Sequence, residues 1–181
     1  KRGSTGLKEN TLTESARYLF YHLNSATFLD FLENLSGISG LCTDPYLNES
    51  GFHLSTQSGH LDIHADFSHH DRLKLERRLN VLIYLNKEWD SGFNGNLGLY
   101  STDLSLIHQV EPLANRVVVF STSRTSYHGF PDKLNIHSDY IDKHYGRKSI
   151  AMFYYTASTG RDRHKIIFPQ DPTFTFESTV Q

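Results

Sequence analysis

The chain has 181 residues, of which 38% are hydrophobic and 13% aromatic, so we expect one domain with a buried core and exclude a disordered chain. The net charge is -2, with 18 basic and 20 acidic residues and no basic block, which argues against a nucleic-acid partner. The single cysteine, Cys42, excludes an internal disulfide and indicates the cytoplasm, and neither a membrane span nor a signal peptide is visible. The chain starts at Lys1, which leaves open a longer parent protein, and the oligomeric state is open too.

The first fifty residues are predicted to be mainly helical. Residues 1–12 are polar and indicate a loose tail, and Glu14–Leu23 fits a helix. Ser25 is a candidate N-cap for a second helix that ends at Gly37. Apolar residues recur at helical spacing within that second helix, at Phe28, Leu29, Leu32 and Leu35. This stripe predicts packing against a sheet.

From Gly51 onward the pattern becomes that of β-structure. Strands are predicted at 52–57, 61–66, 78–86, 97–100, 107–110, 116–121, 125–128 and 147–155. The continuous apolar run in 78–86 predicts burial on both faces of that strand. Many short strands after a helical start predict a mainly β protein, a double-stranded β-helix (jelly roll, cupin-like) with flanking N-terminal helices.

The whole chain, 1–181, is predicted to be a single domain. Residues 13–50 would form a helical support, 51–157 the core of the β-roll, and 158–181 a C-terminal extension. That extension is expected either to cover an edge strand or to reach a partner.

His64 and Asp66 are the first candidate metal ligands. Between Gly59 and Asp66 apolar and polar residues alternate, so on a strand His64 and Asp66 project to the same side. With a second histidine they would form the two-His, one-carboxylate triad, which leaves positions open as Fe(II) oxygenases require. A His-x-Asp pair alone is a weak signal, because His60/Asp62 and His137/Asp139 have the same spacing. The alternative for each pair is a solvated polar strand face.

His128 is the candidate third ligand. It follows the apolar strand residues 117–120 after a short turn, so the chain can return across the roll there. A histidine on a surface turn is the alternative. His137 and His144 compete for the role, but they lie in a polar loop without a strand to hold them rigidly.

Arg147 is the candidate cation for an anionic cosubstrate. On the last strand Arg147 and Ser149 share a face, so a guanidinium and a hydroxyl can bind one carboxylate together. The phenol of Tyr84 could reach the same carboxylate, and a hydrogen bond to the backbone is an equal alternative for it.

Taken in order, these segments resemble the Fe(II)/2-oxoglutarate dioxygenases, in the prolyl 4-hydroxylase-like branch that includes the hypoxia-factor prolyl hydroxylases. The likeness spans 28–156 and rests on Gly59 and Leu61 before His64-x-Asp66, on 79–90 with its Tyr-Leu-Asn-Lys-x-Trp-Asp, on 95–99, on His128-Gly129, and on Arg147-x-Ser149-Ile150. The run 31–38 followed by Asp44-Pro45 is similar to a microbial subgroup. Two features depart from the family pattern: Asn96 replaces a second glycine, and 131–146 lengthens the interval from His128 to Arg147.

The resemblance implies that His64, Asp66 and His128 bind Fe(II), and that Arg147, helped by Tyr84 and Ser149, holds the distal carboxylate of 2-oxoglutarate. The implied reaction is hydroxylation of a prolyl residue in a peptide or protein. It consumes O2 and is coupled to decarboxylation of 2-oxoglutarate to succinate and CO2, with ascorbate (vitamin C) as a candidate reductant. No side chain is expected to act as an acid or base. Loops 68–76, beside the metal, and 131–146, at the substrate mouth, are expected to select the substrate.

Three alternatives remain. The first is a hydroxylase of a free or carrier-bound small molecule. The second is a non-catalytic β-roll that binds a metal or ligand, against which the complete residue set argues. The third is a zinc hydrolase, which would leave Arg147 and Tyr84 without a purpose. The presence of Asp66 argues against the halogenase variation of the family.

Overall fold

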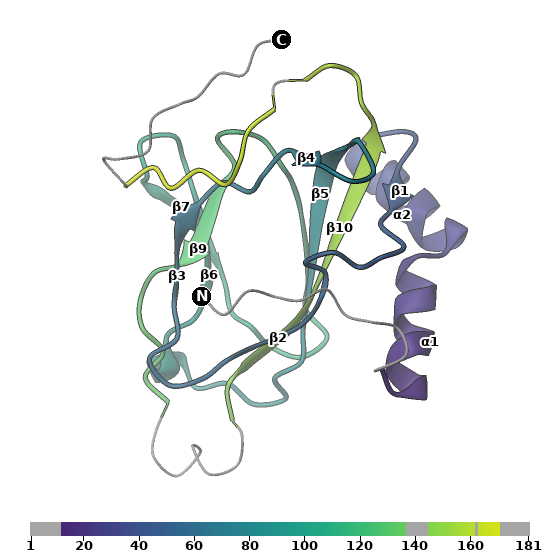
Figure 1. Ribbon diagram of the computed structural model, residues 1–181. Coiled ribbons are helices and arrows are strands. Elements are labelled where there is room, and N and C mark those ends of the chain that lie inside the picture. The colour runs from purple at the N-terminus through teal and green to yellow at the C-terminus, as the bar shows by residue number, and fades with distance from the viewer. Residues whose placement is uncertain (1–11, 137–144, 162, 171–181) are drawn as a thin grey trace.

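Two antiparallel sheets form the body of the protein in the computed structural model, which describes residues 12–136, 145–161 and 163–170. The sheets face one another, and both helices lie on the outer side of the larger sheet (Figure 1). The prediction of a mainly β protein with flanking N-terminal helices is therefore confirmed. The assignment of 1–181 to a single domain stays a prediction.

The two helices are α1 (Glu14–Leu23) and α2 (Ala26–Ser36). The hydroxyl of Ser25 accepts a hydrogen bond from the backbone N–H of Phe28, so Ser25 is the N-cap that the sequence predicted. Gly37 ends α2 in the left-handed conformation, with φ 71°. Leu32 is fully buried, whereas Leu35 is 58% exposed, because only the first two turns of the predicted stripe reach the core. Neither helix has the length and apolar character needed to cross a bilayer.

The larger sheet is built around its two longest strands, β5 (Leu75–Tyr84) and β10 (Arg147–Ala157). β10 also pairs with β1 (Cys42–Thr43) and β2 (Gly51–Ser55). β5 also pairs with β4 (His69–His70) and β8 (Val117–Ser121). The smaller sheet has the order β3 (Leu61–His64), β9 (Tyr127–Phe130), β6 (Leu97–Tyr100) and β7 (Leu106–Val110). A 3-10 turn, η2 (Ser91–Phe93), precedes β6.

Side chains alternate between the two faces of β5 and β10. One face packs into the hydrophobic core under the helices, and the other points toward the smaller sheet and carries candidate site residues. One face of this pair packs against Phe20, Leu23 and Leu32 of the helices through Leu79, Val81, Ile150, Met152 and Tyr154. Most of β5 is buried, as its apolar run predicted. The opposite face of the same strands points between the sheets and carries Tyr84, Arg147 and Ser149, all of which are buried.

The structure corrects several predicted element boundaries. β1 and β4 lie in stretches predicted to be a connection and a loop, because a strand of two residues has no periodicity to detect. β5 begins three residues earlier than predicted, at Leu75. β3 ends at His64, so Asp66 follows the strand rather than belonging to it, and His128 lies inside β9.

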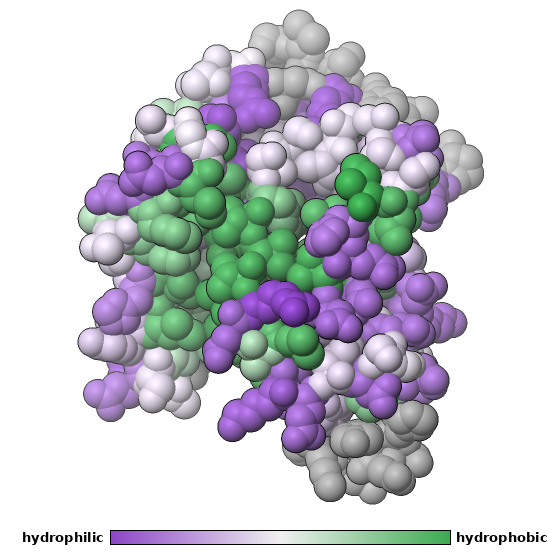
Figure 2. Space-filling view, turned by 180° about the vertical axis from the view of Figure 1, so that it is seen from behind, coloured by the Kyte–Doolittle hydropathy of each residue, from purple (hydrophilic) through white to green (hydrophobic). Residues whose placement is uncertain are grey.

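The C-terminal extension covers the end of β3. The backbone groups of Ala65 and Ile167 exchange two hydrogen bonds of 2.9 Å. Of the two roles predicted for the extension, covering a strand is the one observed. From the side opposite to Figure 1, an apolar area occupies the middle of the molecule and is bordered by hydrophilic side chains (Figure 2).

Candidate metal centre and cosubstrate pocket

His64, Asp66 and His128 converge at one point between the sheets. His64 and His128 are direct partners in the antiparallel pairing of β3 with β9, and Asp66 follows two residues later. One ligand atom from each side chain lies within 4.8 Å of the other two. The Nε2 atoms of His64 and His128 are each 3.4 Å from a carboxylate oxygen of Asp66.

The two imidazole rings are oriented through their other nitrogens. Nδ1 of His64 is 2.8 Å from the carbonyl oxygen of Asp62, and Nδ1 of His128 is 3.0 Å from that of Ser126. Because a carbonyl only accepts, each Nδ1 carries a proton, and a neutral ring then has its lone pair on Nε2. Two such lone pairs facing one carboxylate form a set of donor atoms for a cation. This donor set fits a divalent metal such as Fe(II), with coordination positions left open.

The carboxylate of Asp66 is anchored by two residues that the sequence did not reveal. Its Oδ2 accepts hydrogen bonds from Nη2 of Arg77, at 3.0 Å, and from Nδ2 of Asn80, at 2.6 Å. Burial favours the neutral acid, but the positive charge of Arg77 is the main effect that outweighs it, so the pKa of Asp66 lies well below its usual range. The carboxylate is therefore ionised, as a metal ligand must be.

A β-bulge brings Arg77 to the site. In a regular strand Arg77 and Asn80 would point to opposite faces of β5. On β10, Tyr154 pairs with Leu79 of β5, but the next residue, Tyr155, pairs with Arg77. Arg78 therefore has no partner on β10 and is the extra residue of the bulge. Beyond the bulge Arg77 therefore shares the inner face with Asn80. Periodicity cannot locate a bulge, which is why these partners of Asp66 were missed.

Arg147 lies at the other end of the same interior. Its guanidinium is buried, donating from Nε to the carbonyl oxygen of Gly95 at 2.8 Å and from Nη2 to the hydroxyl of Tyr84 at 3.0 Å. Within the described residues, no acidic side chain forms an ion pair with it. Because a buried guanidinium without a counter-charge is costly, this site fits a carboxylate ligand.

The other two predicted cosubstrate residues lie beside Arg147. Tyr84 and Ser149 are direct partners in the pairing of β5 with β10, and both are buried. Within the described residues, the phenol of Tyr84 accepts a hydrogen bond from Arg147 and forms none with the backbone, and its contact with a carboxylate stays a prediction. Burial raises the pKa of Tyr84, and the charge of Arg147 opposes this only in part. The phenol therefore stays protonated at neutral pH.

Gly95 permits the close approach that this pocket needs. Its φ is +80°, and a Cβ atom there would lie 2.5 Å from Cδ2 of Leu134 and 3.4 Å from Cδ of Arg147. The sequence analysis included this glycine in the segment 95–99 of the family resemblance, without the physical reason for it.

The remaining sequence candidates are placed as follows. His60 and Asp62 have exposed side chains, as the solvated alternative required. His137 and His144 lie outside the described residues. Ser68 and His69, from the loop predicted beside the metal, line a cavity together with Arg77, which contacts Asp66. The described start of the 131–146 loop packs at the Arg147 end instead, where Leu134 is buried against Phe93.

Residues 50–133 match the family described as the 2OG-Fe(II) oxygenase superfamily. The prolyl 3-hydroxylase OGFOD1 of Mus musculus is 28% identical over 144 residues, which are 77% of this chain and 24% of that protein. This chain therefore spans about a quarter of that relative's length.

Two solved structures of prolyl 4-hydroxylases are also similar. One from Phytophthora capsici is 19% identical, with a TM-score of 0.54 over 78% of this chain and 43% of the other. One from Pseudomonas putida is 18% identical, with a TM-score of 0.48 over 87% and 73%. The likeness to the Phytophthora capsici structure confirms the predicted double-stranded β-helix fold.

Proposed function

We propose that the chain is a dioxygenase domain of the 2OG-Fe(II) oxygenase superfamily, of the prolyl hydroxylase type, and that it hydroxylates a prolyl residue in a peptide or protein. In this proposal His64, Asp66 and His128 hold Fe(II). Arg147 binds the distal carboxylate of 2-oxoglutarate together with the hydroxyls of Tyr84 and Ser149. No side chain serves as an acid or base.

The observation that carries this proposal is the spacing between the two ends of the interior. Phe130 follows His128 by two residues on the same face of β9, and its ring lies 4.3 Å from Cζ of Arg147. Two residues along a strand span roughly 7 Å. A short dicarboxylate that chelates a metal at His128 would therefore place its far carboxylate at Arg147.

When bound, Fe(II) would supply the activation of O2, with 2-oxoglutarate converted to succinate and CO2 and ascorbate acting as the reductant. The chain's own residues bind and orient. Asp62 and Ser126 fix the imidazoles through their carbonyls, Arg77 and Asn80 fix the carboxylate, and burial excludes water from around Arg147.

A peptidyl substrate is supported by the relative from Mus musculus, which bears the name of a prolyl 3-hydroxylase. The single cysteine also fits the reducing cytoplasm that we propose as the compartment.

The test has two stages. Purified protein is incubated with Fe(II), 2-oxoglutarate, ascorbate and O2, and succinate is measured, with His64→Ala as the inactive control. A proline-containing peptide library and a metabolite extract are then compared by mass spectrometry for the gain of one oxygen atom. Absence of succinate under all conditions would overturn the dioxygenase activity. Oxygen gain confined to small molecules would overturn the peptide substrate alone.

A further inference from the structure

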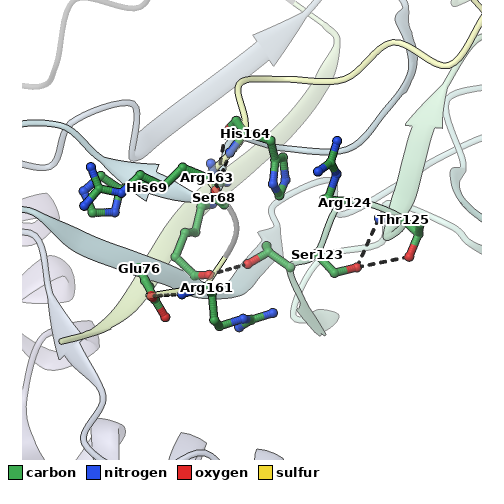
Figure 3. Close-up of a pocket in the computed structure, with 11 residues that line it drawn as sticks. Ser68, His69, Glu76, Ser123, Arg124, Thr125, Arg161, Arg163 and His164 are labelled. Atoms are coloured by element: carbon green, nitrogen blue, oxygen red, sulfur yellow. Dashed lines mark hydrogen bonds between the residues drawn. The ribbon is translucent and has the colours of Figure 1, made fainter. Parts of the chain in front are cut away.

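A cavity of about 280 Å³ is lined in part by Arg77, whose guanidinium also donates a hydrogen bond to Asp66 of the candidate metal centre. It is far larger than the roughly 10–15 Å³ that one water needs. Four parts of the chain contribute to its wall: 68–69, the start of β5, 122–125, and in the C-terminal segment Arg161, Arg163 and His164 (Figure 3). It therefore forms only where the C-terminal extension crosses the end of the larger sheet.

The cavity is lined by an excess of positive charge. Among the described residues, four arginines line it, Arg77, Arg124, Arg161 and Arg163, against one carboxylate, that of Glu76. Arg77 is paired with Asp66. Within the described part of the chain, neither Arg161 nor Arg163 forms an ion pair with an acidic side chain, and both are exposed.

Within the described residues, Glu76 forms no ion pair with a guanidinium group, and its oxygens accept hydrogen bonds from the C-terminal segment instead. Its Oε1 accepts from the backbone N–H groups of Thr159, at 2.8 Å, and Arg161, at 3.0 Å. Its Oε2 accepts from the hydroxyl of Thr159 at 3.0 Å. Glu76 thus holds the C-terminal segment in place and leaves the side chains of Arg161 and Arg163 for another anion.

His69 gives an independent indication of a ligand. Its side chain lines the cavity and is only 9% exposed, yet neither Nδ1 nor Nε2 has a hydrogen-bond partner in the described structure. Leaving a buried polar group unsatisfied costs stability, so such a group indicates a missing partner. Burial, followed by the charge of Arg163, lowers the pKa of His69, and the charges of Asp71 and Glu76 oppose this only in part.

We propose that this cavity binds an anionic group of the substrate, a carboxylate or a phosphate carried close to the residue that is oxidised. Guanidinium forks bind both groups with two parallel hydrogen bonds, and the imidazole of His69 adds a third donor. Because Arg77 both lines the cavity and contacts Asp66, the anion would lie one side chain away from the metal. This inference rests on the proposed function, and it assigns to that site a preference for acidic peptides.

The test uses three pools of fluorescent proline-containing peptides that differ only at the flanking positions, which carry Glu, phosphoserine or Gln. Binding to the full chain loaded with Mn(II) and 2-oxoglutarate is measured by anisotropy without O2. We expect an anionic pool to bind at least about tenfold more tightly than the Gln pool. Tighter binding of the Glu pool identifies a carboxylate as the ligand, and tighter binding of the phosphoserine pool identifies a phosphate.

The double variant Arg161→Ala, Arg163→Ala is expected to bind all three pools equally. Both side chains are exposed, and the backbone N–H that holds Glu76 is retained in the variant. Arg17→Ala on α1, an exposed arginine remote from the cavity, should keep the preference. Equal binding of the three pools to the unmodified protein, or an unchanged preference in the double variant, would overturn the inference.

A second readout separates this inference from the proposed function. Succinate formation without peptide depends on the metal and Arg147 sites alone, so we expect it to be the same in the double variant as in the unmodified protein. Loss of succinate in the double variant alone would overturn the assignment of these arginines to substrate binding. Absence of succinate in every protein would contradict the proposed function, whereas the binding preference would still test the anion site.

Discussion

Arg77 holds the acidic residue of the candidate metal centre: its Nη2 lies 3.0 Å from Oδ2 of Asp66, and both side chains are buried. The guanidinium is itself fixed, because its Cζ lies 3.6 Å from the ring centre of Phe153 and its Nε donates to Asn80 at 2.9 Å. The carboxylate is therefore oriented before a metal arrives, and less ordering is required on binding.

Arg77→Ala is expected to weaken metal binding about 10- to 100-fold, the usual effect of removing a residue that orients a ligand. The dissociation constant for Mn(II) would be measured by titration calorimetry. Arg78→Ala is the matched control, since Arg78 is the neighbouring residue in the bulge and donates to Thr156 instead. An unchanged constant in a folded Arg77→Ala protein would show that Asp66 is held by other means.

Loss of either ligand should abolish succinate formation, but the two variants should differ in stability. His64→Ala removes a neutral ring, whereas Asp66→Ala leaves the buried charge of Arg77 without its partner, which costs about 3–5 kcal/mol. Urea unfolding of the metal-free proteins measures this difference. Activity in either variant, or equal free energies of unfolding, would count against the assignment.

Arg147→Ala should raise the KM for 2-oxoglutarate roughly ten- to a hundredfold, because a charge-assisted hydrogen bond contributes about 1.5–3 kcal/mol. Tyr84→Phe removes only a neutral donor, so a rise of about fivefold is expected. Lys148→Ala is the control, a cation on the adjacent residue of β10. A KM in Arg147→Ala that matches the control would mean that another cation binds the cosubstrate.

Gly95→Ala tests the close approach at Arg147. Gly40 is a matched position, because its φ of +73° is similar to the +80° of Gly95 but no atom lies within 4 Å of the added Cβ. Gly40→Ala should therefore cost about 1–2 kcal/mol of backbone strain alone. Gly95→Ala should cost more and also raise the KM for 2-oxoglutarate. Equal losses of stability in thermal unfolding, with an unchanged KM, would show that Leu134 and Arg147 move aside freely.

The carboxylate of Glu76 holds the C-terminal segment, and we expect its contribution to the stability of the protein to depend on pH. Burial raises its pKa, but hydrogen bonds from Thr159 and Arg161 outweigh this and lower it. A lowered folded-state pKa contributes stability that is present above the unfolded value of about 4.3 and is lost as the pH falls through the folded-state pKa. The destabilisation by Glu76→Gln should therefore be full at neutral pH and shrink in acid. Denaturant unfolding from pH 6 to 3 measures it, and a pH-independent difference would contradict this role.

The sequence could predict the positions of residues whose orientation follows from the alternation of side chains along a strand. His64 and Asp66, or Arg147 and Ser149, lie two apart, and their common side follows from the alternation of a strand even though Asp66 lies just past the end of β3. Arg77 was not predictable, because a bulge reverses its face. Nor was the pairing of Ala65 with Ile167, since backbone hydrogen bonds between segments a hundred residues apart leave no mark on the side-chain pattern.

The most direct test of the account is a crystal structure of the protein with Mn(II) in place of Fe(II) and with 2-oxoglutarate. We predict one anomalous peak bounded by Nε2 of His64, Nε2 of His128 and a carboxylate oxygen of Asp66, with the distal carboxylate of 2-oxoglutarate on Arg147. A metal bound elsewhere, or a 2-oxoglutarate carboxylate that does not contact Arg147, would contradict it.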